Sequence, residues 1–405
     1  MKNKKSFLIY LIVYLAYTSI YVARVNLSVA SPALQELGVF DAAGYGVIGG
    51  LFSAVYAVGR LVMGGVGDKT PPWIMLSVGL GFAGVANLLL GFLPPYVAVL
   101  ILWLINAWAQ SMLWSSVLCV VSSLYSGDKL KRMTSLMVTA VATGNVVSII
   151  LSTWVIYSFG VAFAFIVPGG FTLIMGIVIV FVTRGIKSAD VSSGEEKKKH
   201  ISVFGLLGKR DILLMCIPSV FHGVMKENVS VWMFTYAKDA FSVDLSTSSY
   251  FLLVIPLIGL VGRLLYPLAL RALGGRENRV SIIGFGVCIL ASVLLLFKSF
   301  GFVTALISLA LIYAASSMVN TSITSIYPMS YRASGNVASV SGLLDFASYL
   351  GAGVSGIIYG FVIEKSEVGY PSMFISWIVL SFLSAAMLVI INALRRKENE
   401  KCALQ

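Results

Sequence analysis

Charged residues are scarce in this chain. Asp, Glu, Lys and Arg make up 11% of its 405 residues, whereas soluble domains carry about 25%. The scarcity excludes an ordinary soluble globular protein. The chain also has only two histidines and four cysteines, and the cysteines show no paired spacing. We therefore expect no disulfide, no metal site and no cofactor. No catalytic serine, cysteine or metal constellation is present, so the sequence does not indicate an enzyme.

Long apolar runs make up most of the sequence instead. Hydrophobic residues account for 58% of the chain, and a helix needs about 20 consecutive apolar residues to cross a bilayer. A hydropathy window predicts an all-α membrane protein with twelve transmembrane helices. The predicted spans are 7–33, 43–64, 72–93, 96–124, 134–158, 161–183, 211–237, 247–271, 280–299, 302–328, 335–363 and 370–394.

A polar stretch divides these spans six and six. Residues 184–210 contain a serine- and glycine-rich segment followed by Glu195, Glu196 and three lysines, which is typical of a solvated linker. We therefore expect an N-terminal six-helix bundle over 1–183, a linker over 184–210 and a C-terminal six-helix bundle over 211–405.

The basic residues outside the spans are distributed unevenly. If the N-terminus is cytoplasmic, Lys238, Lys298 and Lys365 are the lysines or arginines on the opposite side, and all the others lie on the cytoplasmic side. The positive-inside rule thus predicts a multi-pass protein of the cell membrane with both termini in the cytoplasm. The same distribution explains the net charge of +12 without a nucleic-acid partner.

Arg24 lies deep in the first span, in the stretch YTSIYVARVNLSVASP, which contains no acidic residue. A cation near the bilayer centre costs about 2.5–3.5 kcal/mol on insertion scales, so such a residue is rarely kept without a use. The halves resemble copies, because Gly59-Arg60-Leu61 in the second span recurs as Gly262-Arg263-Leu264 in the eighth. Near the cytoplasmic helix ends, Arg60 and Arg263 are expected to snorkel or to hold those ends together.

Lys226 in the seventh span matches Arg24 in the first, at a similar depth. Parallel repeats related by an axis along the membrane normal should place one cation in each half. Our main hypothesis is that Arg24 and Lys226 bind an anion. The alternative is a structural ion pair with Glu227 or Asp345, the acidic residues deep in the spans.

Helical spacing adds candidates beside each cation. Tyr17, Tyr21 and Arg24 recur at i, i+4 and i+7, on one helix face. His222 precedes Lys226 by one turn, while Glu227 points about 100° away from it and is expected to meet another helix. Weaker candidates, which interhelical hydrogen bonding explains equally well, are Asn145, Tyr349, Gln110 and Asn320.

The turn after the second span reads Gly64-Gly65-Val66-Gly67-Asp68-Lys69. Its glycines allow close helix contact, and Asp68 is suited to a neighbouring helix N-terminus, whose dipole favours a carboxylate. An ordinary tight turn explains the stretch equally well.

This turn, the twelve spans and the six-plus-six division resemble the major facilitator superfamily. The resemblance implies that Gly64, Asp68 and Lys69 form a latch, or gate, on the cytoplasmic side. The matching turn after the eighth span, GGRENR, lacks the aspartate.

Within that superfamily, YTSIYVARVN is similar to the first span of organophosphate:phosphate antiporters. The resemblance implies that Tyr17, Tyr21 and Arg24 bind phosphate, with Asn26 two residues on. The seventh span looks like the second phosphate-binding segment, with Lys226 where arginine is common. SYLGAG around Tyr349 and the fifth span around Asn145 also match, but the family histidine before Asn145 is Gly144 here.

RVNLSVASP is also similar to the first span of anion:cation symporters, which move carboxylates such as sugar acids. Those have an acidic residue before the arginine, where this chain has Ala23. The expected function is therefore secondary transport of a small organic anion by alternating access, as a monomer. A phosphorylated metabolite exchanged for phosphate, with possible proton coupling, ranks first. The alternatives are carboxylate symport and a non-transporting anion sensor.

The charges suggest a test with pH. Arg24 and Lys226 would attract a divalent anion best when Glu227 and Asp345 are protonated or paired elsewhere. Glu227→Gln and Asp345→Asn mimic the protonated acids, so transport by at least one variant should lose its rise toward low pH. Transport rates measured between pH 5 and pH 8 check this, and an unchanged pH dependence in both variants would contradict proton coupling through these residues.

Overall fold

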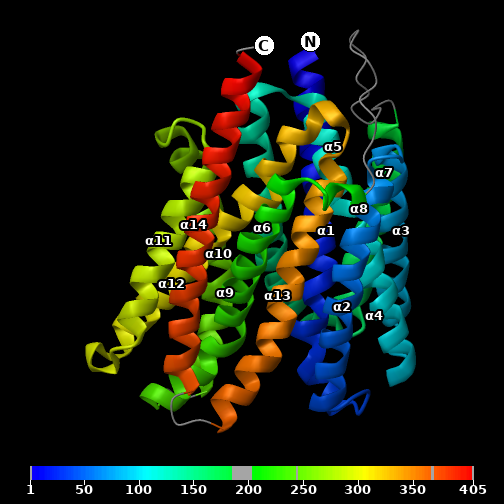
Figure 1. Ribbon diagram of the computed structural model, residues 1–405. Coiled ribbons are helices and arrows are strands. Elements are labelled where there is room, and N and C mark those ends of the chain that lie inside the picture. The colour runs from blue at the N-terminus through cyan, green and yellow to red at the C-terminus, as the bar shows by residue number, and fades with distance from the viewer. Residues whose placement is uncertain (1, 185–202, 243–244, 366–368, 404–405) are drawn as a thin grey trace. The chain divides into compact units, whose positions relative to one another are not determined.

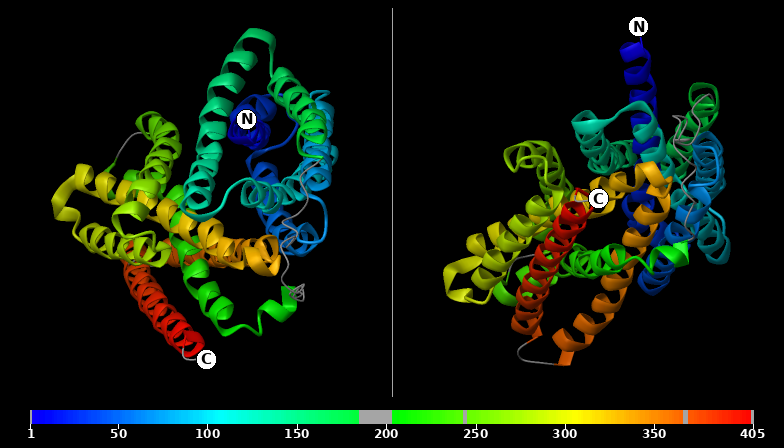
Figure 2. Two further views of the ribbon diagram at one scale, coloured as in Figure 1. Left: turned by 90° about the horizontal axis from the view of Figure 1, so that it is seen from above. Right: turned by 45° about the horizontal axis from the view of Figure 1, so that its top comes forward.

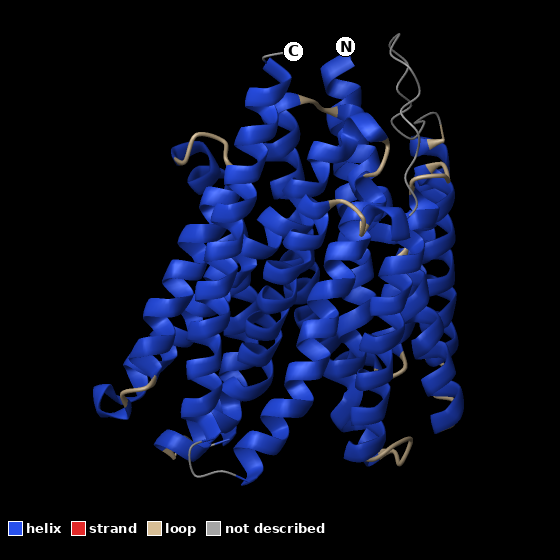
Figure 3. Cartoon of the chain, in the orientation of Figure 1, coloured by secondary structure: helices blue, strands red, loops and turns tan. Residues whose placement is uncertain are grey.

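The structure is a computed structural model that describes residues 2–184, 203–242, 245–365 and 369–403. Within these ranges the secondary structure is helical, with no strand (Figure 3). Most of the predicted linker, residues 185–202, lies outside the described residues, and its described end contains the short helix α8 (Val203–Leu206).

Each predicted span of the first half corresponds to a helix or a pair of helices (Figure 1). The fourth span is divided at Met112 into α4 and α5. The elements are α1 (Lys2–Glu36), α2 (Ala42–Gly67), α3 (Pro72–Leu90), α4 (Tyr96–Ser111), α5 (Leu113–Leu124), α6 (Gly127–Phe159) and α7 (Phe163–Thr183).

The second half agrees with the predicted spans in the same way. The tenth span continues from an α-helix into a π-helical segment and then a 3₁₀ segment, rather than ending near residue 328. The elements are α9 (Arg210–Phe241), α10 (Leu245–Ala272), α11 (Glu277–Leu295), η1 (Lys298–Phe300), α12 (Gly301–Asn320), η2 (Thr321–Ile326), η3 (Tyr327–Ser334), α13 (Val337–Lys365) and α14 (Gly369–Ala403).

Ten stretches of the described residues are long and apolar enough to cross a membrane. They cover the predicted spans other than the seventh and eighth, which correspond to α9 and α10. The charged pair Lys226 and Glu227 lies in the middle of α9, as expected of a helix that carries intramembrane polar groups.

Backbone contacts divide the chain into two compact units. Unit 1 comprises Met1–His200 with Met329–Gly342, and unit 2 comprises Ile201–Pro328 with Leu343–Gln405. The segment Met329–Gly342, which contains most of η3 and the first residues of α13, thus packs with helices of the first half of the sequence. In the left view of Figure 2, α1 is seen end-on beside α6 and α7, with which it packs inside unit 1.

The two units repeat the same internal pairing of helices. In unit 1, α3 packs on α7 and on α4, α2 packs on α4, and α1 packs on α7. In unit 2, the corresponding pairs are α11 with α14 and α12, α10 with α12, and α9 with α14. An internal repeat is therefore present in the packing as well as in the sequence.

The repeated Gly-Arg pair has the same surroundings in both units. A Cβ on Gly59 would collide with Ser111 of α4, and one on Gly262 would lie 2.5 Å from the Ala314 oxygen of α12. The arginines that follow, Arg60 and Arg263, are only 3% and 5% exposed. The expectation that they snorkel toward water is wrong, because the close helix crossing beside them leaves their side chains inside the unit.

A buried amide network joins the helices around α1. The Asn26 amide donates to Asn87 Oδ1 of α3 (2.8 Å) and to the Ala164 oxygen of α7 (2.9 Å). Asn87 and Asn106 donate in turn to the Ala23 oxygen of α1, at 3.1 and 3.3 Å. Hydrocarbon offers no competing partner for these groups, so the network fixes α1 among its neighbours.

Asp68 caps a helix that follows it by some 270 residues in sequence. Its carboxylate accepts hydrogen bonds from the backbone N–H groups of Ala338 and Ser339, both at 2.8 Å, in the first turn of α13. The positive end of that helix dipole adds to the stabilisation. The sequence-based expectation for Asp68, a neighbouring helix N-terminus, agrees with this contact, which lies entirely within unit 1.

Gly64 lies one turn before Asp68 and allows this contact to form. A Cβ on Gly64 would come within 2.9 Å of the Ala338 oxygen and 3.2 Å of the Gly342 Cα. A Cβ on Gly342 would in turn collide with the Arg60 backbone oxygen. The backbones of α2 and of the first turns of α13 therefore touch, and any side chain at either glycine would separate them.

We expect Asp68→Asn to lower the thermal stability of the purified protein. A neutral amide oxygen replaces two charge-assisted hydrogen bonds and the interaction with the helix dipole, a loss of about 1–2 kcal/mol. Thermal unfolding in detergent measures the effect. Asp41→Asn is the matched control, because Asp41 caps α2 through a single exposed bond to the Gly44 N–H (2.7 Å). Equal effects of the two substitutions would contradict a special role for Asp68.

Candidate functional site

Arg24 is surrounded by aromatic rings within unit 1. Its Cζ lies 4.8 Å from the ring centre of Phe52 and 4.7 Å from that of Tyr56, both on α2. Tyr21, one turn earlier on α1, contributes a third ring at 5.8 Å. The faces of aromatic rings carry negative potential, so they stabilise a guanidinium that has left water. Arg24 is thus held by α1 and α2 together.

The α2 aromatics were not among the sequence-based candidates. Phe52, Tyr56 and Arg60 recur every four residues on one face of α2, and that spacing is the signal which could have identified them. The Phe52 and Tyr56 rings are stacked, 6.1 Å apart, and the Arg60 Cζ lies 5.6 Å from the Tyr56 ring centre. The Tyr56 ring is therefore in contact with both Arg24 and Arg60.

Tyr17 and Tyr21 do share a face of α1, as their spacing predicts. Their hydroxyl oxygens are 3.3 Å apart, within hydrogen-bonding distance. Tyr17 is buried against Trp114 of α5, with ring centres 5.1 Å apart, whereas Tyr21 is half-buried beside Arg24. Tyr21 is the better placed of the two to meet a ligand at Arg24, and Tyr17 fixes its hydroxyl.

Asn145 lies on α6, next to the point where that helix crosses α1. Its Oδ1 atom is buried and has no hydrogen-bond partner among the described residues, so it is able to accept a bond from a ligand.

The preceding residue, Gly144, explains the missing family histidine. A Cβ there would lie 2.5 Å from the Tyr21 Cβ and 2.7 Å from the Thr18 oxygen, so this helix crossing excludes any larger residue.

Lys226 forms an ion pair with the next residue in the sequence. Its Nζ atom lies 2.6 Å from Oε1 of Glu227, and the two side chains are 17% and 39% exposed. Adjacent helix positions point about 100° apart, yet the two side chains are long enough to meet. The expected contact of Glu227 with another helix stays a prediction. The structural ion pair, proposed above as the alternative for Lys226, is therefore formed in this structure.

His222 is buried one turn before Lys226, where α9 packs on α13. Its Nδ1 atom lies 3.2 Å from the Ser348 hydroxyl, and its Nε2 atom has no hydrogen-bond partner among the described residues. The helices are in close contact here, because a Cβ on Gly223 would collide with the Ser348 backbone. His222 thus contributes to helix packing, with one ring nitrogen left for a further contact.

Asp345 and Tyr349 lie one turn apart on α13, and each directly follows a residue, Leu344 or Ser348, that bonds to α9. Asp345 is buried, at 7% exposure, and Tyr349 is half-buried. Lys69, the last residue of the predicted gate, is exposed beside the Asp68 cap. The structure therefore brings Tyr21 next to Arg24 in unit 1 and Glu227 next to Lys226 in unit 2.

We expect Gly144→Ala to destabilise unit 1 by about 1–3 kcal/mol, because overpacking at a close backbone crossing forces the helices apart. Thermal unfolding checks this. Gly81→Ala on α3 is the matched control, since a Cβ there meets nothing within 4 Å and alanine favours the helix by about 1 kcal/mol. A Gly144→Ala protein as stable as the control would contradict the crossing.

A comparison with protein families matches residues 7–356 to the family described as Major Facilitator Superfamily. Solved structures of low sequence identity share the fold. The transporter FucP in the outward conformation superposes with a TM-score of 0.80 at 12% identity, covering 96% of this chain and 99% of that one. The human organic anion transporter MFSD10 gives 0.74 at 16% identity, covering 95% and 99%.

Curated relatives are distant. The membrane sensor protein UhpC of Escherichia coli is 24% identical over 63% of this chain and 62% of its own length. A glycerol-3-phosphate transporter of Haemophilus influenzae is 31% identical over 25% of this chain and 22% of its own length. A glucose-6-phosphate exchanger of Bos taurus is 27% identical over 35% of this chain and 30% of its own length. The chain thus matches less than two thirds of each.

Proposed function

The chain belongs to the major facilitator superfamily of multi-pass membrane transporters, and we propose that it exchanges a phosphorylated metabolite for inorganic phosphate across the cell membrane. Its distant relatives are members of the organophosphate:phosphate antiporter family. The printed names of two of them specify glycerol 3-phosphate and glucose 6-phosphate, which supports a small phosphate ester as the substrate class.

The observation that carries this proposal is the aromatic enclosure of Arg24. Three rings hold the guanidinium deep in a membrane-spanning helix, and one of them is the ring of Tyr21. A guanidinium presents several N–H donors in a planar fork that matches phosphate oxygens. We propose that Arg24 and Tyr21 bind the phosphoryl group, and that Asn145 accepts a hydrogen bond from the substrate.

In this proposal, Lys226 supplies the second positive charge for the anion. In the substrate-free structure it is neutralised by Glu227, so an incoming anion competes with that carboxylate for the lysine. Protonation of Glu227 would release Lys226 to the anion, which gives the proposed coupling a chemical basis. Each repeat then contributes one cation to a cycle of alternating access, with both termini in the cytoplasm.

A carboxylate substrate is the first alternative, because the first span is also similar to that of anion:cation symporters. Lysine lacks the bidentate fork of arginine, so the site chemistry around Lys226 suits a carboxylate as well as a phosphate. A non-transporting sensor is the second alternative. It is favoured by one observation: the relative that matches 63% of this chain is named a membrane sensor protein.

Counterflow in proteoliposomes tests the proposal. Vesicles loaded with phosphate should take up radiolabelled phosphate, and glycerol 3-phosphate or glucose 6-phosphate should compete. We expect Arg24→Gln to reduce uptake about 10- to 100-fold, because a charge-assisted hydrogen bond contributes about 1.5–3 kcal/mol. Arg24→Lys should retain part of the uptake. Lys298→Gln, outside the site, is the control.

The alternatives predict different outcomes of the same experiment. Competition by sugar acids but not by sugar phosphates would indicate a carboxylate symporter. Saturable phosphate-ester binding by calorimetry, without any uptake, would indicate a sensor. Full uptake by Arg24→Gln would contradict the role of the enclosed arginine in either kind of transport, and undiminished binding by that variant would contradict it in a sensor.

A further inference from the structure

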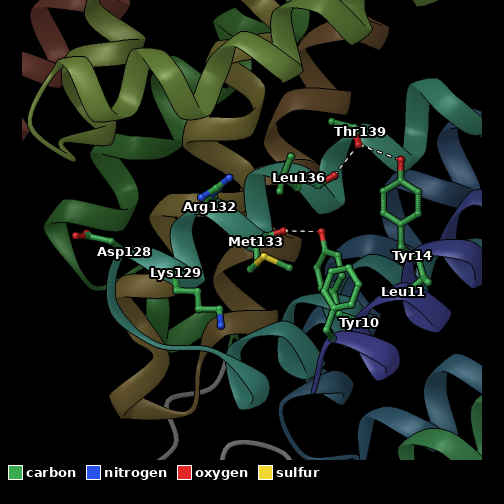
Figure 4. A pocket seen from close by; sticks show the side chains of 10 residues that line it. Tyr10, Leu11, Tyr14, Asp128, Lys129, Arg132, Met133, Leu136 and Thr139 are labelled. Atoms are coloured by element: carbon green, nitrogen blue, oxygen red, sulfur yellow. Dashed lines mark hydrogen bonds between the residues drawn. The ribbon is translucent and has the colours of Figure 1, made fainter. Parts of the chain in front are cut away.

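An open groove of about 730 Å³ lies between α1 and α6 in unit 1 (Figure 4). This volume lies within the range of about 300–1,000 Å³ that is typical of ligand sites. Arg24 is not among its lining residues, so the groove is distinct from the proposed substrate site. It is lined by Phe7, Tyr10, Leu11, Tyr14, Asp128, Lys129, Arg132, Met133, Leu136 and Thr139.

The walls of the groove are mostly apolar. Phe7 and Leu11, one turn apart on α1, are 55% and 41% exposed, and Leu136 lines the groove from α6 (Figure 4). Exposed apolar side chains at the start of a membrane helix favour contact with acyl chains over contact with water.

The polar groups in the groove are already bonded within the protein. The Tyr10 hydroxyl donates to the Met133 oxygen at 3.0 Å. The Tyr14 hydroxyl hydrogen-bonds with the hydroxyls of Thr139 and Thr143, both at 3.0 Å. The interior of the groove therefore offers little to a small polar solute, which would lose its water without gaining new bonds.

One end of the groove is positively charged. Lys129 and Arg132 lie one turn apart near the start of α6, both exposed, and Asp128 precedes them. Figure 4 shows the Asp128 side chain directed away from that of Arg132. Lys129 Nζ also lies 5.2 Å from the Tyr125 ring centre, which holds this cation near the groove. The net charge of the three groups is positive.

We propose that this groove binds an anionic phospholipid of the leaflet in which the chain begins. The headgroup phosphate binds Lys129 and Arg132, and one acyl chain lies along Phe7, Leu11 and Leu136. Basic residues at the surface of an anionic leaflet attract its headgroups, and burial of the acyl chain against the apolar walls adds hydrophobic stabilisation. A groove with a positively charged end and apolar walls along the rest matches an amphiphile and not a free anion.

Native mass spectrometry of the detergent-purified protein tests this proposal. With an equimolar mixture of dioleoyl-phosphatidylglycerol and dioleoyl-phosphatidylcholine, we expect the protein to bind at least five times as much of the anionic lipid as of the zwitterionic one. In Lys129→Gln/Arg132→Gln that preference should fall to below twofold. Leu11→Trp, which fills the apolar part without changing charge, should weaken binding of the anionic lipid by at least threefold. Both variants are first checked for an unchanged thermal midpoint.

Arg276→Gln/Arg279→Gln is the matched control, because these exposed arginines have the same spacing at the start of α11 but do not line this groove. It should keep the full preference. Equal binding of the two lipids by the unsubstituted protein, or an equal loss in the control, would overturn the proposal. Displacement of the lipid by inorganic phosphate or by glycerophosphoglycerol alone would show a site for small anions and overturn it as well.

Discussion

Hydrocarbon cannot hydrogen-bond, and this constraint explains the partners of several polar groups in the described helices. Asn26 and Asn87 bond to each other and to backbone oxygens of their neighbours. Arg24 is stabilised by the faces of aromatic rings, and Lys226 by a carboxylate. Asp68 is bonded to the N–H groups of a helix terminus. In each case the partner lies within the same unit, so the polar groups that mark the candidate site also help to fold the bundle around it.

The two cations are stabilised by different means, although they hold matching places in the repeat. The guanidinium of Arg24 lies against the faces of aromatic rings. Lys226, by contrast, donates to Glu227 at 2.6 Å. Within the proposed function, the cation of the first repeat is stabilised by aromatic rings, and that of the second by a carboxylate that a proton or the substrate itself has to displace. The distinction fits a binding residue and a coupling residue better than two identical clamps.

Most spans were predictable from sequence because apolar length indicates them. The starts of α3 and α9 lie within one residue of the predicted starts, and their ends differ by three and four residues. The Asp68 contact was predictable because a carboxylate in a glycine-rich turn has few other suitable partners. Other features depend on tertiary contacts that spacing does not contain. Phe52 and Tyr56 lie on a different helix from Arg24. The burial of Arg60 and Arg263 depends on helix crossings at the preceding glycines. The orientation of Glu227 depends on a lysine rotamer, which helical periodicity does not specify.

Glycines at helix crossings have a mechanical consequence for unit 1. Gly144 brings α6 onto the α1 backbone, while Gly84 and Gly169 bring α3 and α7 so close that a Cβ on either would lie 3.0 Å from the carbonyl oxygen of the other. Surfaces in backbone contact cannot slide past one another without first separating, since interiors are close-packed and resist compression. These backbone contacts leave each helix of unit 1 little freedom to bend independently of its neighbours. A change of shape then has to come from the segments that join rigid pieces.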